Sequence, residues 1–211
     1  MTIKAAFFDF GGVILSSPFE AFNRYEDANR LPRDLIRTIN STNPDTNAWA
    51  RFERSEVSFE EFCDLFEAEA RELGHEIAAR EIMPLLAGEI RPEMVEAVRR
   101  CSERLKTAVL TNNWVSFDDF PNAAHSPGRD EVLSMFDAII ESSVVGVRKP
   151  DQRFYEIACE MVGVSPEECV FLDDLGVNLK PAREMGMTTI KVLSAEQAIS
   201  DLEQVLGFPL R

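Results

Sequence analysis

Residues 4–13 read KAAFFDFGGV, and this stretch decides the fold. It is a short apolar run that ends at an aspartate and two glycines. A continuous apolar run of this length, bounded by a turn signal, is typical of a strand buried on both faces. Gly11 and Gly12 predict a tight turn after it. Asp9 is therefore expected at the end of a buried strand, immediately before a turn.

Beyond Pro92, predicted helices and strands alternate. The apolar patterns predict strands at 107–111, 138–142, 169–174 and 188–193, and helices at 93–104, 151–162, 177–185 and 195–206. A polar stretch rich in Pro, Gly and Asn, 116–130, predicts a long loop. Alternation of this kind implies a parallel sheet with helices on both faces. The predicted fold class is α/β, with a Rossmann-like parallel sheet core and an inserted helical domain.

The insertion follows the first strand. From residue 16 to 88 the apolar residues recur at helical spacing, and no strand pattern interrupts them. Ser58 followed by Glu61 predicts a capping box at a helix start. We therefore expect a sheet core made of residues 1–15 and 89–211, with about four helices in residues 16–88.

Composition narrows the possible partners. The 211 residues carry a formal net charge of −15, which argues against nucleic acid and against an anionic membrane surface. A small anionic substrate is still compatible with this charge, because a metal ion and a lysine can reverse the sign inside a pocket. Nothing in the composition predicts the oligomeric state.

Two further features predict a cytoplasmic protein. The N-terminus, MTIKAAFFDFGGV, lacks the pattern of a signal peptide, and no stretch approaches the roughly 20 apolar residues that cross a bilayer. The four cysteines are widely spaced and form no C-x-x-C pair. We expect buried free thiols rather than disulfides or a zinc site.

Polar residues gather at the predicted strand ends. Ligands of such sheets bind at the carboxyl ends of the strands, which points to Asp9, Thr111, Glu141–Ser143 and Asp173-Asp174; Lys149 follows the 138–142 strand. A carboxylate at a glycine turn can act as a nucleophile. Two carboxylates at neighbouring strand ends can hold Mg²⁺, and a hydroxyl and a lysine can bind phosphoryl oxygens.

At these positions the sequence resembles the haloacid dehalogenase superfamily. The family's first motif, D-x-D-x-[TV], is similar to DFGGV at 9–13. Its second, a Ser or Thr ending an apolar strand, is similar to VLTNN at 109–113. Its lysine motif is similar to VRKPD at 147–151, and its acidic pair to FLDDLGVN at 171–178. The motifs occur in the family's order, and the resemblance covers essentially the whole chain.

The longer stretches TNNW, VRKPD and FLDDLGVNLKPAREMGM also resemble the N-terminal phosphatase domain of soluble epoxide hydrolases and the N-terminal domain of certain acyl-CoA dehydrogenase family proteins. The resemblance implies that the helical insertion is a cap over the active site. It implies a small phosphorylated substrate and Mg²⁺ as cofactor.

The family's roles transfer residue by residue. Asp9 is expected to be the nucleophile and a metal ligand, with the Gly11 carbonyl and Asp174 as further metal ligands. Asp173 is expected outside the metal's direct ligands or bound to it through water, although a structural role is equally compatible with its position.

The substrate-binding residues come from the other two motifs. Thr111 is expected to bind a phosphoryl oxygen, assisted by Asn112 through its backbone or side chain. Lys149 is expected to neutralise the aspartyl-phosphate and to orient Asp9. Catalysis is therefore assigned to Asp9, Thr111 and Lys149.

One position departs from the family pattern. The second Asp of D-x-D, the usual general acid and base of the phosphatases, is Gly11 here, and loss of such a group typically costs about 10² to 10⁴ in rate. The leading interpretation is a magnesium-dependent phosphatase acting through an aspartyl-phosphate on Asp9. The alternatives are a hydrolytic dehalogenase, whose halide leaving group needs no proton, and a binding domain that has lost catalysis.

Overall fold

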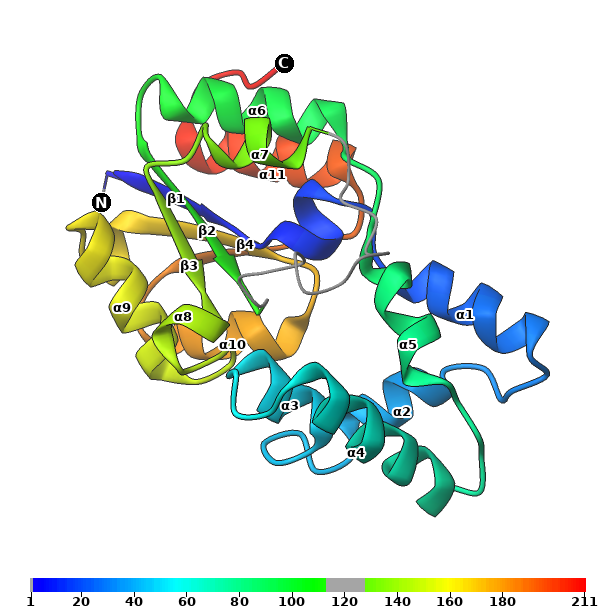
Figure 1. The fold of residues 1–211 in the computed structure, drawn as a ribbon. Coiled ribbons are helices and arrows are strands. Elements are labelled where there is room, and N and C mark those ends of the chain that lie inside the picture. The colour runs from blue at the N-terminus through cyan, green and yellow to red at the C-terminus, as the bar shows by residue number, and fades with distance from the viewer. Residues whose placement is uncertain (1, 113–127) are drawn as a thin grey trace.

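A five-stranded parallel sheet forms the centre of the molecule (Figure 1). The computed structural model describes residues 2–112 and 128–211. The strands are β1 (Ala5–Phe8), β2 (Lys106–Thr111), β3 (Ala138–Glu141), β4 (Cys169–Asp173) and β5 (Thr188–Lys191). Their order across the sheet is β3-β2-β1-β4-β5, and every neighbouring pair is parallel. The predicted α/β fold class is confirmed.

Strand β1 is buried on both faces, as its continuous apolar run predicts. Its four residues are all inaccessible to solvent. Ala6 and Phe8 point into one hydrophobic cluster, whereas Ala5 and Phe7 point into the cluster on the opposite face. The alternation follows from the two-residue period of a strand. Burial of one Phe side chain contributes about 1.5–3 kcal/mol to stability.

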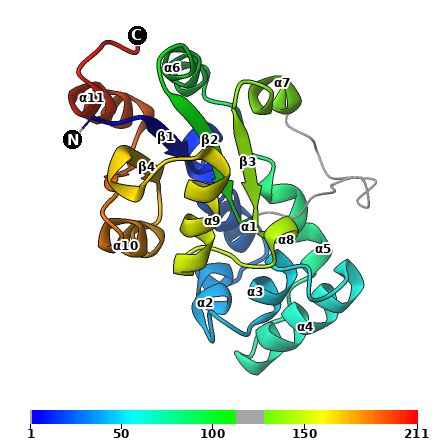
Figure 2. The ribbon, with the colours of Figure 1, turned by 90° about the vertical axis from the view of Figure 1, so that its left-hand side faces the viewer.

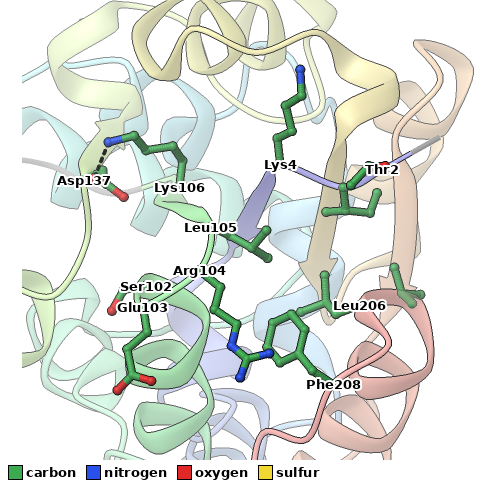
Figure 3. Close-up of a pocket in the computed structure, with 12 residues that line it drawn as sticks. Thr2, Lys4, Ser102, Glu103, Arg104, Leu105, Lys106, Asp137, Leu206 and Phe208 are labelled. Atoms are coloured by element: carbon green, nitrogen blue, oxygen red, sulfur yellow. Dashed lines mark hydrogen bonds and ion pairs between the residues drawn. The ribbon is translucent and has the colours of Figure 1, made fainter.

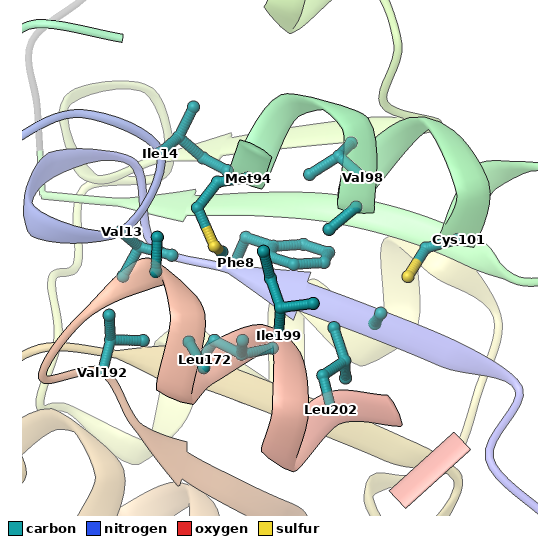
Figure 4. Close-up of a cluster of buried hydrophobic side chains, with 14 of the residues drawn as sticks. Phe8, Val13, Ile14, Met94, Val98, Cys101, Leu172, Val192, Ile199 and Leu202 are labelled. Carbon is teal, nitrogen blue, oxygen red and sulfur yellow. The ribbon is translucent and has the colours of Figure 1, made fainter. Parts of the chain in front are cut away.

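Helices cover both faces of the sheet. Those packed against it are α6 (Pro92–Ser102) and α11 (Ala195–Leu206) on one face, and α9 (Gln152–Val162) and α10 (Gly176–Glu184) on the other. Met94 and Val98 of α6 meet Ile199 and Leu202 of α11 over Phe8 (Figure 4). The predicted helix at 195–206 is confirmed residue for residue.

Residues 16–88, called here the helical segment, contain helices and no strand, as predicted. The helices are α1 (Phe19–Ala28), α2 (Leu35–Ser41), α3 (Ala48–Glu53), α4 (Phe59–Glu72), α5 (Ala79–Ile82) and the 3₁₀ turn η2 (Met83–Leu86). They enclose their own hydrophobic cluster, in which Phe62 and Phe66 are fully buried. The capping box predicted from Ser58 and Glu61 is present at the start of α4. The division into a core domain and a helical domain stays a prediction.

The helical segment leaves and rejoins the core at one point. Leu15 and Ile90 form an isolated antiparallel bridge, and Ser16 N donates to Glu89 O at 2.8 Å. The segment lies at the end of the sheet where the strands terminate (Figures 1 and 2). The carboxyl ends of the strands therefore face the helical segment.

The region after β3 differs from the prediction. The strand expected at 138–142 ends at Glu141, and a short helix, α8 (Ser142–Val145), follows it directly. The next helix begins at Gln152 because the Asp151 side chain caps its first turn. Another unpredicted helix, α7 (Arg129–Leu133), begins inside the 116–130 stretch predicted as a loop, and residues 116–127 of that stretch lie outside the described residues.

Two other expectations concern the whole chain. All four cysteines are buried free thiols, as predicted: Cys63, Cys101, Cys159 and Cys169. Among the residues described, none of the helices is both long and apolar enough to span a bilayer. The cytoplasmic location stays a prediction.

Candidate active site

Asp9 follows β1 directly and begins the turn that the two glycines allow. Phe10–Ile14 form a single π-type turn, and the side chain of Asp9 caps it: Phe10 N donates to Asp9 Oδ1 at 2.7 Å. The residue is only 8% exposed. Oδ2 has no hydrogen-bond partner among the described residues. One carboxylate oxygen is thus fixed, and the other is available for chemistry.

Lys149 places its ammonium between two of the carboxylates. Its Nζ lies 2.9 Å from Asp9 Oδ1 and 2.8 Å from Asp173 Oδ2. The side chain is 1% exposed, and a buried charge of this kind is stable only when paired. Burial disfavours its charged form, but Asp173 and Asp9 outweigh burial and hold the pKa of Lys149 above its usual value.

Both carboxylate oxygens of Asp173 accept hydrogen bonds. Besides Lys149, Leu175 N donates to Oδ1 at 2.7 Å, and Asn178 Nδ2 lies 3.1 Å from Oδ1 and 3.0 Å from Oδ2. Asp173 is completely buried. A carboxylate with this many donors is occupied within the protein, which favours a supporting role for Asp173 over direct metal ligation. Asn178, which closes the FLDDLGVN stretch, serves as a donor to Asp173.

Asp174 completes a group of three carboxylates. Ligand oxygens of Asp9, Asp173 and Asp174 all lie within 4.8 Å of one another. Burial raises the pKa of Asp174 to about 6, with a further contribution from Asp173. Burial also raises the pKa of Asp9; Lys149 opposes the shift, while Asp173 and Asp174 add to it. Two buried carboxylates and the half-buried Asp174 beside one ammonium leave excess negative charge, which a divalent cation would neutralise.

The two glycines of the turn differ in their surroundings. Gly12 has φ +75°, and a β-carbon added there would lie 2.3 Å from Asp174 Oδ2. Gly11 has φ −70° and ψ 134°, which any residue adopts, and a β-carbon there would meet none of the described residues within 4 Å. Only Gly12 is therefore required by the backbone and the packing.

Thr111 and Asn112 follow each other at the end of β2, but their side chains serve different purposes. Thr111 is 8% exposed, and its hydroxyl has no partner within the part of the chain that the structure describes. The amide of Asn112 bonds to the main chain of Lys149, donating to O at 2.9 Å and accepting from N at 2.8 Å. The side chain of Asn112 is thus engaged, which leaves its main-chain N–H for the expected contact with substrate.

The structure adds two residues that sequence reasoning missed. Arg91 Nη1 donates to Gly12 O at 3.0 Å, and its charge partly opposes the rise that burial causes in the pKa of Asp174. Tyr155, fully buried on α9, donates from its hydroxyl to Asn178 O at 2.6 Å. Both contacts join positions far apart in the chain, so no local pattern in the sequence signals them.

A large hollow of about 860 Å³ lies at the other end of the sheet and is separate from these residues. Lys4, Lys106 and Arg104 line it (Figure 3). Lys4 pairs with Glu168 and Lys106 with Asp137, while the Arg104 guanidinium lies over the Phe208 ring. These cations already have partners, so the chemistry is better placed at the carboxyl ends of the strands.

Comparison with known proteins identifies the family. A model of haloacid dehalogenase-like hydrolases matches residues 3–186, and the chain belongs to this family. It is 33% identical to acyl-CoA dehydrogenase family member 10 of Mus musculus over 98% of its length and 19% of that protein. It is 30% identical to bifunctional epoxide hydrolase 2 of Sus scrofa over 100% of its length and 40% of that protein. The chain thus spans less than half of these relatives.

Other similar proteins match over almost their whole length. Sesquiterpene phosphatase astK of Aspergillus oryzae is 27% identical over 98% of both chains. A crystal structure of a HAD family enzyme from Bacteroides thetaiotaomicron, in complex with magnesium and inorganic phosphate, superposes with a TM-score of 0.64 at 20% identity, covering 95% of this chain and 98% of the other. The chain is thus a member of the haloacid dehalogenase-like hydrolase family with similarity to phosphatases, and it has the fold of HAD family enzymes.

Proposed function

We propose that the protein is a magnesium-dependent phosphatase that hydrolyses a small phosphorylated metabolite through an aspartyl-phosphate on Asp9. The observation that carries the proposal is the state of the Asp9 carboxylate. Phe10 N and Lys149 hold Oδ1, and Oδ2 has no partner among the described residues. A carboxylate oriented in this way can act as a nucleophile.

The donor set fits Mg²⁺. This ion prefers oxygen ligands and is commonly held by one or two carboxylates together with substrate phosphate oxygens. Asp9 and Asp174 would hold it, with the Gly11 carbonyl as a third protein ligand, because Asp173 is already occupied by Lys149 and Asn178. When bound, the ion would neutralise charge on the phosphoryl group during transfer.

The chain's own residues would perform the reaction. Oδ2 of Asp9 attacks phosphorus, and the bond from phosphorus to the leaving oxygen breaks, with the electron pair passing to that oxygen. Water then attacks phosphorus, the bond from phosphorus to Oδ2 breaks, and inorganic phosphate leaves as the Asp9 carboxylate is regenerated. The leaving oxygen takes its proton from solvent, and the attacking water gives up its proton to solvent. Lys149 stabilises the negative charge, and the Thr111 hydroxyl and the Asn112 N–H donate hydrogen bonds to phosphoryl oxygens.

Hydrolytic dehalogenation is the second candidate. The observation that favours it is Gly11, which offers no carboxyl group to protonate a leaving alkoxide. The acidic group at Asp9, Asp173 and Asp174 argues against it, since its excess negative charge calls for a cation. A third reading, a binding domain without turnover, also rests on Gly11.

Hydrolysis of p-nitrophenyl phosphate, followed by a screen of phosphorylated metabolites, tests the proposal. We expect turnover that requires Mg²⁺ and stops when EDTA is added. Release of halide from a 2-haloacid without phosphatase activity would support the dehalogenase instead. Binding of phosphate without turnover of any ester would support the binding domain.

A further inference from the structure

The side-chain amide of Asn112 forms hydrogen bonds with both main-chain polar groups of Lys149. Its Nδ2 donates to Lys149 O at 2.9 Å, and its Oδ1 accepts from Lys149 N at 2.8 Å. The two residues lie 37 positions apart. The amide thus forms the same pair of hydrogen bonds with Lys149 that the main chain of a neighbouring strand would form. These bonds fix the position of the Lys149 main chain.

Lys149 depends on such support. It belongs to the connection between α8 and α9, where residues 146–151 form neither helix nor strand. Its buried ammonium must nevertheless reach Asp9 and Asp173 at the same time, at 2.9 and 2.8 Å. Catalytic groups lose effect when they are misplaced by about 1 Å. The main chain of Lys149 must therefore be held firmly.

Arg148, which precedes Lys149, is held by contacts with the helical segment. Arg148 Nη1 donates to Pro44 O at 2.9 Å, and Arg148 Nε lies 2.5 Å from Glu53 Oε2, so that Arg148 binds the helical segment. Asn112, at the end of β2, ties Lys149 to the sheet. The two residues anchor one loop to two different parts of the molecule, and Asn112 provides the anchor on the side of the reaction centre.

We propose that the side chain of Asn112 is a positioning residue for Lys149 and does not bind substrate. The inference rests on the proposed function, since it gives Lys149 a role toward the phosphoryl group. The two bonds to Lys149 use one N–H of Nδ2 and one lone pair of Oδ1 and fix the orientation of the amide, so a substrate could reach only the second N–H and the second lone pair. Asn112→Ala removes both bonds, and Asn112→Asp keeps an acceptor for Lys149 N while placing a negative oxygen against Lys149 O.

A double-mutant cycle separates positioning from binding, because the effects of residues that act through one another do not add. Inorganic phosphate is the probe, titrated by calorimetry with MgCl₂ into the wild type, Asn112→Ala, Lys149→Met and the double variant. We expect about 10-fold weaker binding or more for each single variant, in line with the loss of a well-aligned charged contact, and no further loss in the double variant. The matched control is Thr111→Val, whose effect should add to that of Lys149→Met.

Additive losses for Asn112→Ala and Lys149→Met would overturn the proposal, because they would mean that Asn112 binds the ligand itself. Crystal structures of Asn112→Ala and Asn112→Asp provide a readout that needs no activity. We expect Nζ of Lys149 to leave at least one of its two carboxylates in both. If Nζ keeps both contacts, Asn112 does not position it. If Nζ moves in these variants but the wild type hydrolyses no phosphate ester, the proposed phosphatase activity is wrong, whereas the positioning role of Asn112 is still supported.

Discussion

The carboxylate of Asp174 occupies the space that a side chain on Gly12 would need. A β-carbon on Gly12 would lie 2.3 Å from Asp174 Oδ2 and 2.4 Å from its Cγ, well inside van der Waals contact. Gly12 also has φ +75°, in the left-handed region that side chains disfavour. The turn after β1 and the side chain of Asp174, which follows β4, therefore pack together only while residue 12 has no side chain.

Gly12→Ala should consequently damage the metal site. We expect a loss of about 1 kcal/mol or more in the free energy of unfolding, because Ala resists a positive φ. We also expect Mg²⁺ affinity to fall, because Asp174 must move. Chemical denaturation and magnesium calorimetry measure the two effects. Gly11→Ala is the matched control: its β-carbon meets nothing within 4 Å in the part of the chain that the structure describes, so both quantities should stay close to those of the wild type. Equal damage from the two substitutions would contradict the fit of Gly12 to Asp174.

Asp9→Asn should abolish hydrolysis and leave the fold intact. The amide cannot attack phosphorus, and the change removes a buried charge instead of adding one, so thermal stability should not fall. Turnover of p-nitrophenyl phosphate and circular dichroism are the measurements. Asp137→Asn, at the opposite end of the sheet beside Lys106, is the control and should retain activity. Residual turnover by Asp9→Asn above background would refute the assignment of the nucleophile.

Magnesium affinity should rise with pH. Burial raises the pKa of Asp174 from 3.8 to about 6, so the folded, metal-free protein retains a proton that the unfolded chain has released. Its stability should decline as pH rises from about 4 to about 6, because the folded state binds more protons over this interval. Mg²⁺ must displace the same protons, and Asp9, whose pKa is also raised, extends the trend to higher pH.

Calorimetry in buffers of different ionisation enthalpy measures this proton release directly. We expect release on magnesium binding at about pH 5.5 that diminishes toward about pH 8. Unfolding midpoints of EDTA-treated protein over the same pH range test the predicted decline in stability. Magnesium binding that is independent of pH and releases no protons would contradict the presence of Asp9 and Asp174 in the metal site.

The sequence predicts the sheet well because each strand is a local signal. The run before Gly11 forms β1, and CVFLD at 169–173 forms β4, since continuous apolar runs suit a sheet covered on both faces. The helix α8 escapes prediction because its four residues, Ser142–Val145, are too few to show a helical period. The motifs likewise bring Asp9, Lys149 and the acidic pair together, because they follow strand ends or lie close to them.

The different roles of the residues within the site cannot be predicted from the local sequence. Nothing in DDLGVN indicates that Asp173 receives Lys149 and Asn178, while Asp174 has no such partner among the described residues. The same holds for Asn112, whose partner lies 37 residues away. Hydrogen bonds of this kind depend on tertiary geometry, so they follow only from the fold.

Gly11→Asp should raise the activity of the protein if the missing carboxyl limits it. The backbone at Gly11, φ −70° and ψ 134°, accepts any residue, and no atom of residues 2–112 or 128–211 lies within 4 Å of a β-carbon placed there. The carbonyl proposed as a metal ligand is kept, because it belongs to the backbone. General acid–base catalysis contributes about 10² to 10⁴ in rate, so a gain of about tenfold or more is expected.

The gain should depend on the leaving group. An alkyl phosphate releases an alkoxide that needs a proton, whereas p-nitrophenolate leaves readily without one, so the ratio of kcat/KM for Gly11→Asp to that of the wild type should be larger for alkyl esters. Gly11→Asn is the matched control: it has the same shape as Asp and no proton to give at neutral pH, and it should not raise either rate. If Gly11→Asp folds and binds Mg²⁺ as the wild type does yet changes neither rate, the missing acid does not limit the reaction. The dehalogenase and the binding domain would then explain Gly11 better than the phosphatase does.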